Sequence, residues 1–202
     1  MQSENGTQLI IVRHGQATHN LGKEEQHTFA GSEIDCDLAP QGIVNAEFLA
    51  NTIKRDGAVD AIITSPLKRA SQTAEIINRL IGNVPLFTID ELKEINMGKF
   101  AGLTEAEARK LFPDAARNFY GEEIDEWDFP GGEDFSQVSE RLDVALVKIR
   151  EIVKGKKRVI ICGHGLTNRV LFYKLKPEDQ SLWIQRSYPH DRIEYINIGE
   201  GV

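Results

Sequence analysis

Five side chains of this sequence could together carry out phosphoryl transfer. Arg13 and His14 follow the first of several short apolar runs, and Arg69 lies just past the second. Glu94 follows a weaker third run, and His164 follows the fourth. Two guanidinium groups can bind the nonbridging oxygens of a phosphate, and a neutral imidazole is a competent nucleophile toward phosphorus. A carboxyl group can protonate the leaving oxygen and then, once ionised, activate water. The set suits a phosphate monoester as substrate.

The residues around these side chains predict an alternation of strands and helices. Short runs rich in Ile and Val predict strands, two of them weaker, at residues 9–12, 59–63, 84–89, 159–162 and 193–198. Apolar residues three and four apart predict amphipathic helices at about residues 40–55, 67–81 and 138–152. This order predicts a three-layer α/β/α fold with a mostly parallel central sheet. Ligands bind at the carboxyl ends of the strands in such sheets, so the five side chains should meet at one edge.

Backbone groups complete the predicted anion site. Helices that begin after His14 and after His164 would aim free backbone N–H groups at a bound phosphate. Positive charge and positioning stabilise a phosphoryl-transfer transition state, so the chemistry requires no metal. The sequence has no cluster of Asp, Glu and His at obvious metal-ligand spacing. We therefore expect neither a metal nor a cofactor.

The composition excludes several classes of protein. Of the 202 residues, 41% are hydrophobic and 27% charged, and the net charge is −7. Negative charge disfavours nucleic-acid binding, because that binding depends on clustered Lys and Arg. No apolar run is long enough to span a membrane, and residues 1–8 are polar, so we expect a cytoplasmic protein. Cys36 and Cys162 lie far apart and imply no disulfide.

One domain, residues 1–202, is expected, with a lid-like excursion at about residues 95–134. The excursion is rich in acidic side chains, namely Glu122, Glu123, Asp125, Glu126, Asp128, Glu133 and Asp134. It is either a lid over the site or a solvated insertion. Its aromatic side chains, Phe119, Tyr120, Trp127 and Phe129, either face a substrate or anchor the excursion to the core.

Five blocks of the sequence closely resemble the histidine phosphatase superfamily, the phosphoglycerate mutase-like group. They occur in the family's order, and the resemblance runs from Leu9 to about Ile198. The blocks are LIIVRHGQATHN at 9–20, SPLKRASQTA at 65–74, LKEINMGKFAGLT at 92–104, PGGED at 130–134 and ICGHGLTNRVL at 161–171. The resemblance implies a phosphoglycerate mutase-like fold, with His14 as the nucleophile and Glu94 as the acidic proton donor. The phosphate ligands that it implies are Arg13, Asn20, Arg69 and His164.

Two positions near the expected site depart from the family's pattern. Ala17 stands where Ser or Thr is usual, so a hydroxyl contact to the phosphate is lost unless Thr18 supplies it. Ala39 replaces a usual Ser or Thr before the helix at 40–55, which leaves Asp37 as a possible N-terminal cap. Neither change removes a catalytic group, and we expect an active enzyme.

The resemblance leaves the reaction open between hydrolysis and mutase chemistry. Mutases of the family carry a longer insertion before the second histidine than residues 95–163 here, which favours the phosphatase branch. We therefore expect a metal-independent histidine acid phosphatase-type hydrolase, acting on a small-molecule phosphate monoester through a phosphohistidine on His14. A cofactor-dependent phosphoglycerate mutase is the alternative, and a non-catalytic phosphate-binding regulatory domain is the second. His19, His27 and His190 either line the specificity pocket or lie in solvated loops.

Overall fold

A five-stranded sheet forms the centre of the molecule. The computed structural model describes residues 6–23, 26–120, 127–179 and 189–199. The strands are β1 (Gly6–Arg13), β2 (Ala61–Thr64), β3 (Leu86–Thr88), β4 (Arg158–Gly163) and β5 (Ile193–Gly199). They lie in the order β3-β2-β4-β1-β5, in which only β5 runs antiparallel to its neighbour. The predicted mostly parallel sheet is therefore confirmed.

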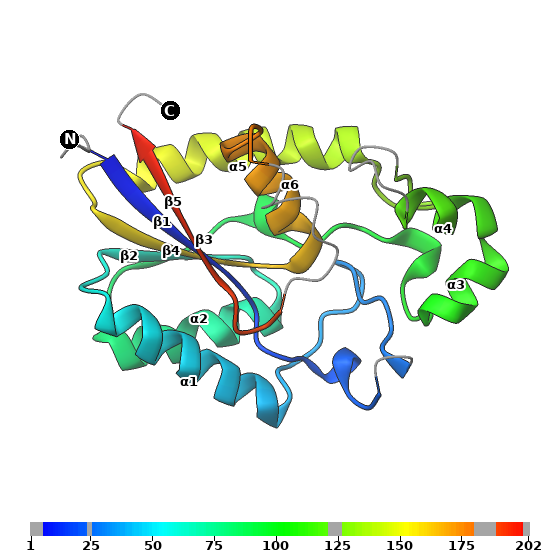
Figure 1. Cartoon of the computed structure of the whole chain (residues 1–202), viewed down its shortest axis with the longest axis horizontal. Helices are drawn as coiled ribbons and strands as arrows, with labels where there is room; N and C mark the ends of the chain where they lie inside the picture. Colours follow the sequence, from blue (N-terminus) through cyan, green and yellow to red (C-terminus); the bar gives the residue numbers. More distant parts are fainter. Residues whose placement is uncertain (1–5, 24–25, 121–126, 180–188, 200–202) are drawn as a thin grey trace.

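Helices cover both faces of this sheet. They are α1 (Pro40–Arg55), α2 (Lys68–Ile81), α3 (Glu105–Leu111), α4 (Pro113–Phe119), α5 (Phe135–Val153) and α6 (Gly165–Leu175). Figure 1 shows α1 and α2 on one side of the sheet and α5 and α6 on the other. Side chains alternate along a strand, so Ile10 and Val12 pack toward α1 and α2 while Leu9 and Ile11 pack in the opposite layer. The three-layer α/β/α prediction is confirmed. None of the described helices has both the length and the apolar character needed to cross a bilayer.

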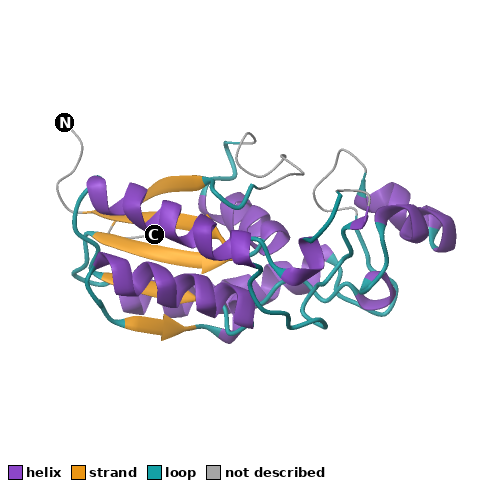
Figure 2. Cartoon of the chain, turned by 90° about the horizontal axis from the view of Figure 1, so that it is seen from below, coloured by secondary structure: helices purple, strands orange, loops and turns teal. Residues whose placement is uncertain are grey.

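The parallel strands bring their carboxyl ends to one edge of the sheet. β1 pairs with β4 in a register that places Arg13 beside Gly163, and β2 pairs with β4 so that Thr64 lies beside Cys162. In Figure 2 the loops and the short helices α3 and α4 lie beyond this edge, to the right of the strands. The chain segments that follow β1, β2 and β4 therefore start side by side.

The expectation of a helix directly after His14 is wrong. β1 leads into a loop that contains a 3-10 turn, Thr18–Asn20, and the next α-helix, α1, begins only at Pro40. Backbone hydrogen bonds hold this loop: the Ala39 N–H donates to the Gln16 carbonyl at 2.9 Å, and the Thr18 N–H to the Asp37 carbonyl at 3.1 Å. The chain directly after β1 is thus paired with the segment before α1. The Gln16 carbonyl and the Thr18 N–H bond to that segment and not within a helix.

The suggested N-terminal cap of α1 is also wrong. Ala39 occupies the cap position with no side-chain hydrogen bond to the helix, and Pro40 starts the first turn. Asp37 instead accepts a hydrogen bond from Gln72 Nε2 at 2.9 Å, which links the loop to α2. Proline lacks an N–H, so one of the groups that a cap would satisfy does not exist here.

The excursion at residues 95–134 packs on the core through its aromatic side chains. Trp127 and Phe129 are only 6% and 1% exposed and belong to the core cluster of the α5 and α6 face. The ring centroids of Phe100 and Phe129 lie 5.2 Å apart, edge to face. These residues anchor the excursion, so the substrate-facing reading is wrong for Trp127 and Phe129. Of the acidic run, residues 121–126 lie outside the described residues.

Candidate active site

His14 lies where β1 ends and is 2% exposed. Its backbone N–H donates to the Gly163 carbonyl at 3.0 Å, which ties it to the end of β4. Its ring atom Nδ1 is 2.7 Å from the Gly15 carbonyl oxygen. A carbonyl can only accept a hydrogen bond, so Nδ1 carries the proton of the neutral ring and Nε2 carries the lone pair. This tautomer leaves the lone pair of Nε2 available for chemistry.

The surroundings of His14 keep its ring uncharged. Burial lowers the pKa of His14 well below its usual value, and the positive charge of Arg13 lowers it further. His164, Arg69 and His190 add smaller effects in the same direction. A protonated imidazole has no lone pair to attack phosphorus, so a lowered pKa leaves the ring at neutral pH in the form that such an attack would need.

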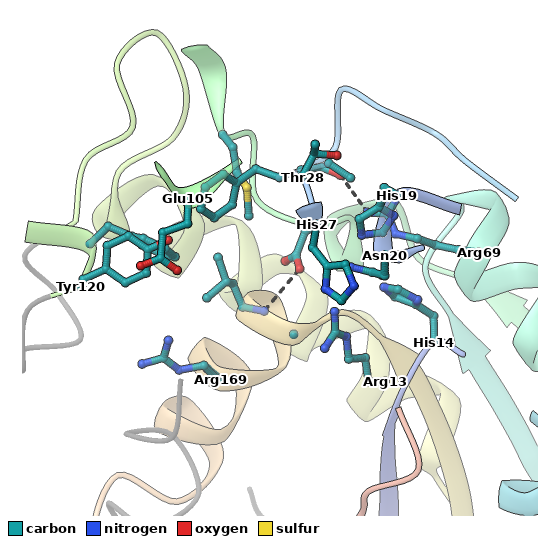
Figure 3. A pocket seen from close by; sticks show the side chains of 18 residues that line it. Arg13, His14, His19, Asn20, His27, Thr28, Arg69, Glu105, Tyr120 and Arg169 are labelled. Atoms are coloured by element: carbon teal, nitrogen blue, oxygen red, sulfur yellow. Dashed lines mark hydrogen bonds between the residues drawn. The ribbon is translucent and has the colours of Figure 1, made fainter. Parts of the chain in front are cut away.

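Two arginines border the same cavity as His14. The cavity has a volume of about 310 Å³, and both Arg13 and Arg69 line it (Figure 3). Arg69, in the first turn of α2, is 1% exposed and donates to the carbonyls of Gly31 at 2.7 Å and Ile34 at 3.0 Å. Its Nε is buried and makes no hydrogen bond within the described part of the chain. Two guanidinium groups beside a neutral histidine suit a phosphoryl group.

His164 lies directly behind His14. It follows β4 and occupies the N-terminal cap position of α6, and the two imidazole centroids are 5.2 Å apart. Its Nε2 is 2.8 Å from Ser65 Oγ, whereas its Nδ1 is buried and makes no hydrogen bond to a described residue. Burial and the charge of Arg69 lower its pKa well below the usual value. His164 is not among the described residues that line the cavity, and its ring packs against that of His14.

Glu94 is held at the amino end of α6. It is 8% exposed and lines the cavity. Its Oε1 accepts hydrogen bonds from the Thr167 N–H at 3.0 Å and from Thr167 Oγ1 at 2.9 Å, and its Oε2 accepts from the Leu166 N–H at 3.3 Å. These donors are the free N–H groups of a helix N-terminus, which bind a carboxylate readily. They fix the carboxyl group on the cavity wall that also holds Gly165.

The loop after His14 supplies two further wall residues. Asn20 lines the cavity, and its Oδ1 is buried without a hydrogen bond to any described residue. His19 also lines the cavity, with its Nδ1 3.1 Å from the free thiol of Cys36. Burial lowers the pKa of His19 to about 3, and the charge of Arg69 adds to this effect. Thr18 is exposed and does not line the cavity, so the described geometry gives no replacement for the hydroxyl missing at Ala17.

Of the other two histidines, His27 lines the cavity and His190 does not. His27 lines the cavity, with Nε2 3.3 Å from the Gly22 carbonyl. His190 lies against His14 without lining the cavity: its Nδ1 donates to the His14 carbonyl at 2.7 Å, and the ring centroids are 5.4 Å apart. Burial is the main cause that lowers the pKa of His190 to about 4. His190 therefore braces the backbone of His14.

The rest of the cavity wall includes two aromatic residues that the sequence offered as substrate-facing and two charged residues that it did not predict. Phe119 and Tyr120 line the cavity, which agrees with the substrate-facing reading for these two aromatic residues. Glu105 at the start of α3 and Arg169 in α6 also line it, although neither was singled out by its position after a strand. In the view of Figure 3, Glu105, Tyr120 and Arg169 lie on the side of the cavity away from His14. Among the described residues, no group of three or more His, Cys, Asp or Glu side chains could hold a metal ion.

Comparison with known proteins decides the family. The family model of the histidine phosphatase superfamily (branch 1) matches residues 9–201. The chain belongs to the histidine phosphatase superfamily. The match covers almost the whole chain. It includes the neutral histidine and the two arginines that line the cavity at the ends of parallel strands.

Relatives of this superfamily member include both phosphatases and mutases. A metal-independent phosphoserine phosphatase from Arabidopsis thaliana is 30% identical over 169 residues, which cover 84% of this chain and 68% of the relative. A 2,3-bisphosphoglycerate-dependent phosphoglycerate mutase from Cytophaga hutchinsonii is 35% identical, with 85% of this chain and 79% of the relative covered. The crystal structure of phosphoglycerate mutase from Bacillus anthracis aligns with a TM-score of 0.76 at 21% identity, covering 98% of this chain and 90% of that one. This last match confirms the phosphoglycerate mutase-like fold.

Proposed function

We propose that this protein is a metal-independent phosphatase that hydrolyses a small-molecule phosphate monoester through a phosphohistidine on His14. The observation that carries the proposal is the state of His14: a buried, uncharged ring whose Nδ1–H is engaged by the Gly15 carbonyl, beside two guanidinium groups. The resemblance to family members named as phosphatases supports the same reaction.

In the first step, His14 Nε2 attacks phosphorus. A bond forms between Nε2 and phosphorus while the bond from phosphorus to the ester oxygen breaks. The proposed hydrogen-bond donors to the nonbridging oxygens are Arg13, Arg69 and Asn20, which line the cavity. His164 is a proposed further phosphate ligand, through its buried Nδ1 that has no hydrogen bond to a described residue. Fixed positive charge around these oxygens lowers the barrier, because they carry the charge of the transition state.

Glu94 is the proposed acid and base. Its protonated carboxyl gives a proton to the leaving alcohol oxygen in the first step, and its carboxylate takes a proton from water in the second. Water then attacks phosphorus, the bond to Nε2 breaks, and inorganic phosphate leaves with His14 restored. The hydrogen bonds from the Leu166 and Thr167 N–H groups support this role, since they hold the carboxyl group in place on the cavity wall.

Mutase activity is the second candidate, favoured by the 35% identity to a bisphosphoglycerate-dependent mutase. A mutase must pass the phosphoryl group from the enzyme to a second alcohol before water reaches it. It would interconvert phosphoglycerates, and it would depend on a bisphosphate to phosphorylate the histidine first.

The test is release of inorganic phosphate in the presence of EDTA. A panel of phosphate monoesters is assayed with wild type and His14→Ala, and 3-phosphoglycerate is included with and without 2,3-bisphosphoglycerate. The proposal expects release by wild type and a loss of at least about 1,000-fold in His14→Ala, because the nucleophile is removed. Isomerisation without release would assign the protein to the mutases. Binding of vanadate with neither reaction would instead indicate a non-catalytic phosphate-binding domain.

A further inference from the structure

The cavity extends well beyond the space that a phosphoryl group needs. Arg13, His14 and Arg69 line its inner end, and the leaving group of a bound ester would occupy the rest of its volume of about 310 Å³. The outer wall contains one cationic and one anionic side chain, Arg169 and Glu105, from different elements of the fold (Figure 3). These two side chains are not part of the proposed hydrolytic machinery.

Arg169 lies about one helical turn along α6 from the glycine that contacts Arg13. The amino end of α6 lies against Arg13, since the ideal Cβ position of Gly165 is 3.7 Å from the guanidinium carbon of Arg13. Arg169 comes four residues later in α6, which corresponds to about 6 Å along the helix axis. Gly165, Leu166 and Arg169 all line the cavity, as expected for positions on one face of a helix. A second anionic group of the substrate can therefore be bound by Arg169 while its phosphoryl group is bound by Arg13.

Glu105 contributes a carboxylate that pairs with Arg109 one turn along α3. Its Oε1 accepts a hydrogen bond from Arg109 Nε at 2.8 Å, and the Arg109 guanidinium lies 3.9 Å from the centroid of the Tyr120 ring. Within the described residues, Oε2 of Glu105 accepts no hydrogen bond. The ion pair and the cation–π contact keep Glu105 at the cavity wall, where it can accept a hydrogen bond from a cationic group.

We infer that the cavity selects a phosphate ester whose leaving group carries both a carboxylate and an ammonium group, that is, an O-phosphorylated α-amino acid. Arg169 binds the carboxylate and Glu105 binds the ammonium. The inference rests on the proposed function, because it takes the inner end of the cavity as the phosphoryl site. A second phosphate in place of the carboxylate is disfavoured, since Glu105 would repel its greater negative charge.

Four esters of equal chain length test the inference. O-phosphoserine carries both groups, 3-phosphoglycerate only the carboxylate, 2-amino-1,3-propanediol monophosphate only the ammonium, and glycerol 3-phosphate neither. Each chiral ester is assayed as both enantiomers, and kcat/KM is obtained from phosphate release. We expect O-phosphoserine to exceed glycerol 3-phosphate by about 100-fold, because each charge-assisted hydrogen bond is worth about tenfold.

Two variants assign the groups to the residues. Arg169→Gln should lower kcat/KM for O-phosphoserine and 3-phosphoglycerate about tenfold more than for glycerol 3-phosphate. Glu105→Gln should lower kcat/KM for the two ammonium esters, O-phosphoserine and 2-amino-1,3-propanediol monophosphate, about tenfold more than for glycerol 3-phosphate. Arg150→Gln is the control, since Arg150 is exposed near the carboxyl end of α5 and does not line the cavity. It removes one positive charge without changing the ranking of the esters.

The outcomes separate this inference from the proposed function. If the four esters are hydrolysed at equal rates, or if each variant affects all four equally, the inference is overturned while the phosphatase assignment stands. If neither these esters nor an aryl phosphate releases phosphate, the proposed function itself fails. Opposite assignments, with Arg169→Gln acting only on the ammonium esters, would also overturn the inference.

Discussion

At the scale of single residues, the same positive charges serve two purposes. Arg13 and Arg69 border the cavity where a phosphate dianion would bind, and they also lower the pKa of His14 and His164. A site built only to bind phosphate would gain from protonated histidines. Here burial is the largest cause of the lowered pKa, so the site holds a neutral ring at His14 and forgoes one more positive charge.

The charge state of His14 can be measured directly. Because its pKa lies well below 6.5, the ring should remain neutral, with the proton on Nδ1, both at pH 8 and at pH 6.5. Nitrogen-15 NMR of the histidine side chains reports the charge and the tautomer, and a His14→Asn variant assigns the signals. Half-protonation of His14 near pH 6.5 would contradict this account of the site.

Substitution of Glu94 tests the acid–base role. Glu94→Gln keeps an acceptor oxygen for the Thr167 N–H and loses the one for the Leu166 N–H, and it can neither donate the proton nor accept it. We expect kcat for an alkyl ester to fall by about 100-fold or more. The rate of the first step should fall less for an aryl ester, because its leaving group needs no proton. Burst kinetics measure the rate of that step separately. Equal losses in the first step for both esters would indicate that Glu94 acts only by positioning.

The residues that could be predicted from sequence are those that follow strands. His14, Arg69 and His164 were predicted because a short apolar run precedes each one and parallel strands end together. Glu94 also follows an apolar run, but β3 ends at Thr88 and a 3-10 turn lies between them, so the strand position is a weaker signal for Glu94 and the family block adds to it. Glu105 and Arg169 were missed because they reach the cavity from α3 and from the second turn of α6, positions that no strand end marks.

At the scale of elements, the loop after β1 depends on a close contact with α1. A Cβ on Gly42 would lie 2.1 Å from the Gln16 carbonyl oxygen, and a Cβ on Gly15 would lie 2.2 Å from the Gly42 carbonyl oxygen. These distances are far below any real contact, and both neighbours are backbone atoms. The two glycines therefore allow the loop that carries His14 to lie on the first turn of α1.

Gly42→Ala should disrupt this contact. We expect a loss of about 1–3 kcal/mol in the free energy of unfolding and a fall in kcat, because the His14 loop must move away from α1. Urea unfolding and phosphate release measure the two effects. Val44→Ala is the matched control, since Val44 is 53% exposed on the same helix. A Gly42→Ala protein with unchanged stability and activity would show that the loop position does not depend on this contact.

The failed expectations about elements have a common physical cause. A helix was expected after His14 because strands and helices alternate elsewhere, but long-range pairing of Ala17 with Leu38 holds that segment as a loop. Local sequence patterns contain no information about such pairing.

In the excursion, the aromatic pattern alone could not separate the anchors, Trp127 and Phe129, from the cavity residues Phe119 and Tyr120. That separation depends on how α4 and the segment at Trp127 pack against the core.

At the scale of the whole molecule, the buried histidines predict how stability depends on pH. The pKa is lowered in the folded chain for four of them: His14, His19, His164 and His190. Between the folded pKa and the unfolded value of about 6.5, the unfolded chain binds more protons than the folded one. Stability is therefore complete above about pH 6.5 and is lost as the pH falls below it.

The size of this effect is measurable. Each histidine that stays neutral in the fold should cost on the order of 2 kcal/mol of stability between pH 7 and pH 5. Urea unfolding at several pH values gives the slope, and His164→Asn should reduce it, because one buried titrating group is removed. A free energy of unfolding that is equal at pH 7 and pH 5 would be incompatible with buried, neutral histidines.

In the proposed mechanism the phosphoryl group passes through His14, and this step can be tested by trapping the phosphohistidine. A substrate that releases phosphate is labelled with 32P, mixed rapidly with the enzyme, and quenched in alkali, which preserves phosphohistidine; the labelled peptide is then identified by mass spectrometry. We expect 32P label on His14 within the first turnover and none in His14→Ala. The Glu94→Gln variant should hold more label, because its dephosphorylation is slowed. Turnover without a covalent intermediate, or label on any other residue, would contradict the mechanism.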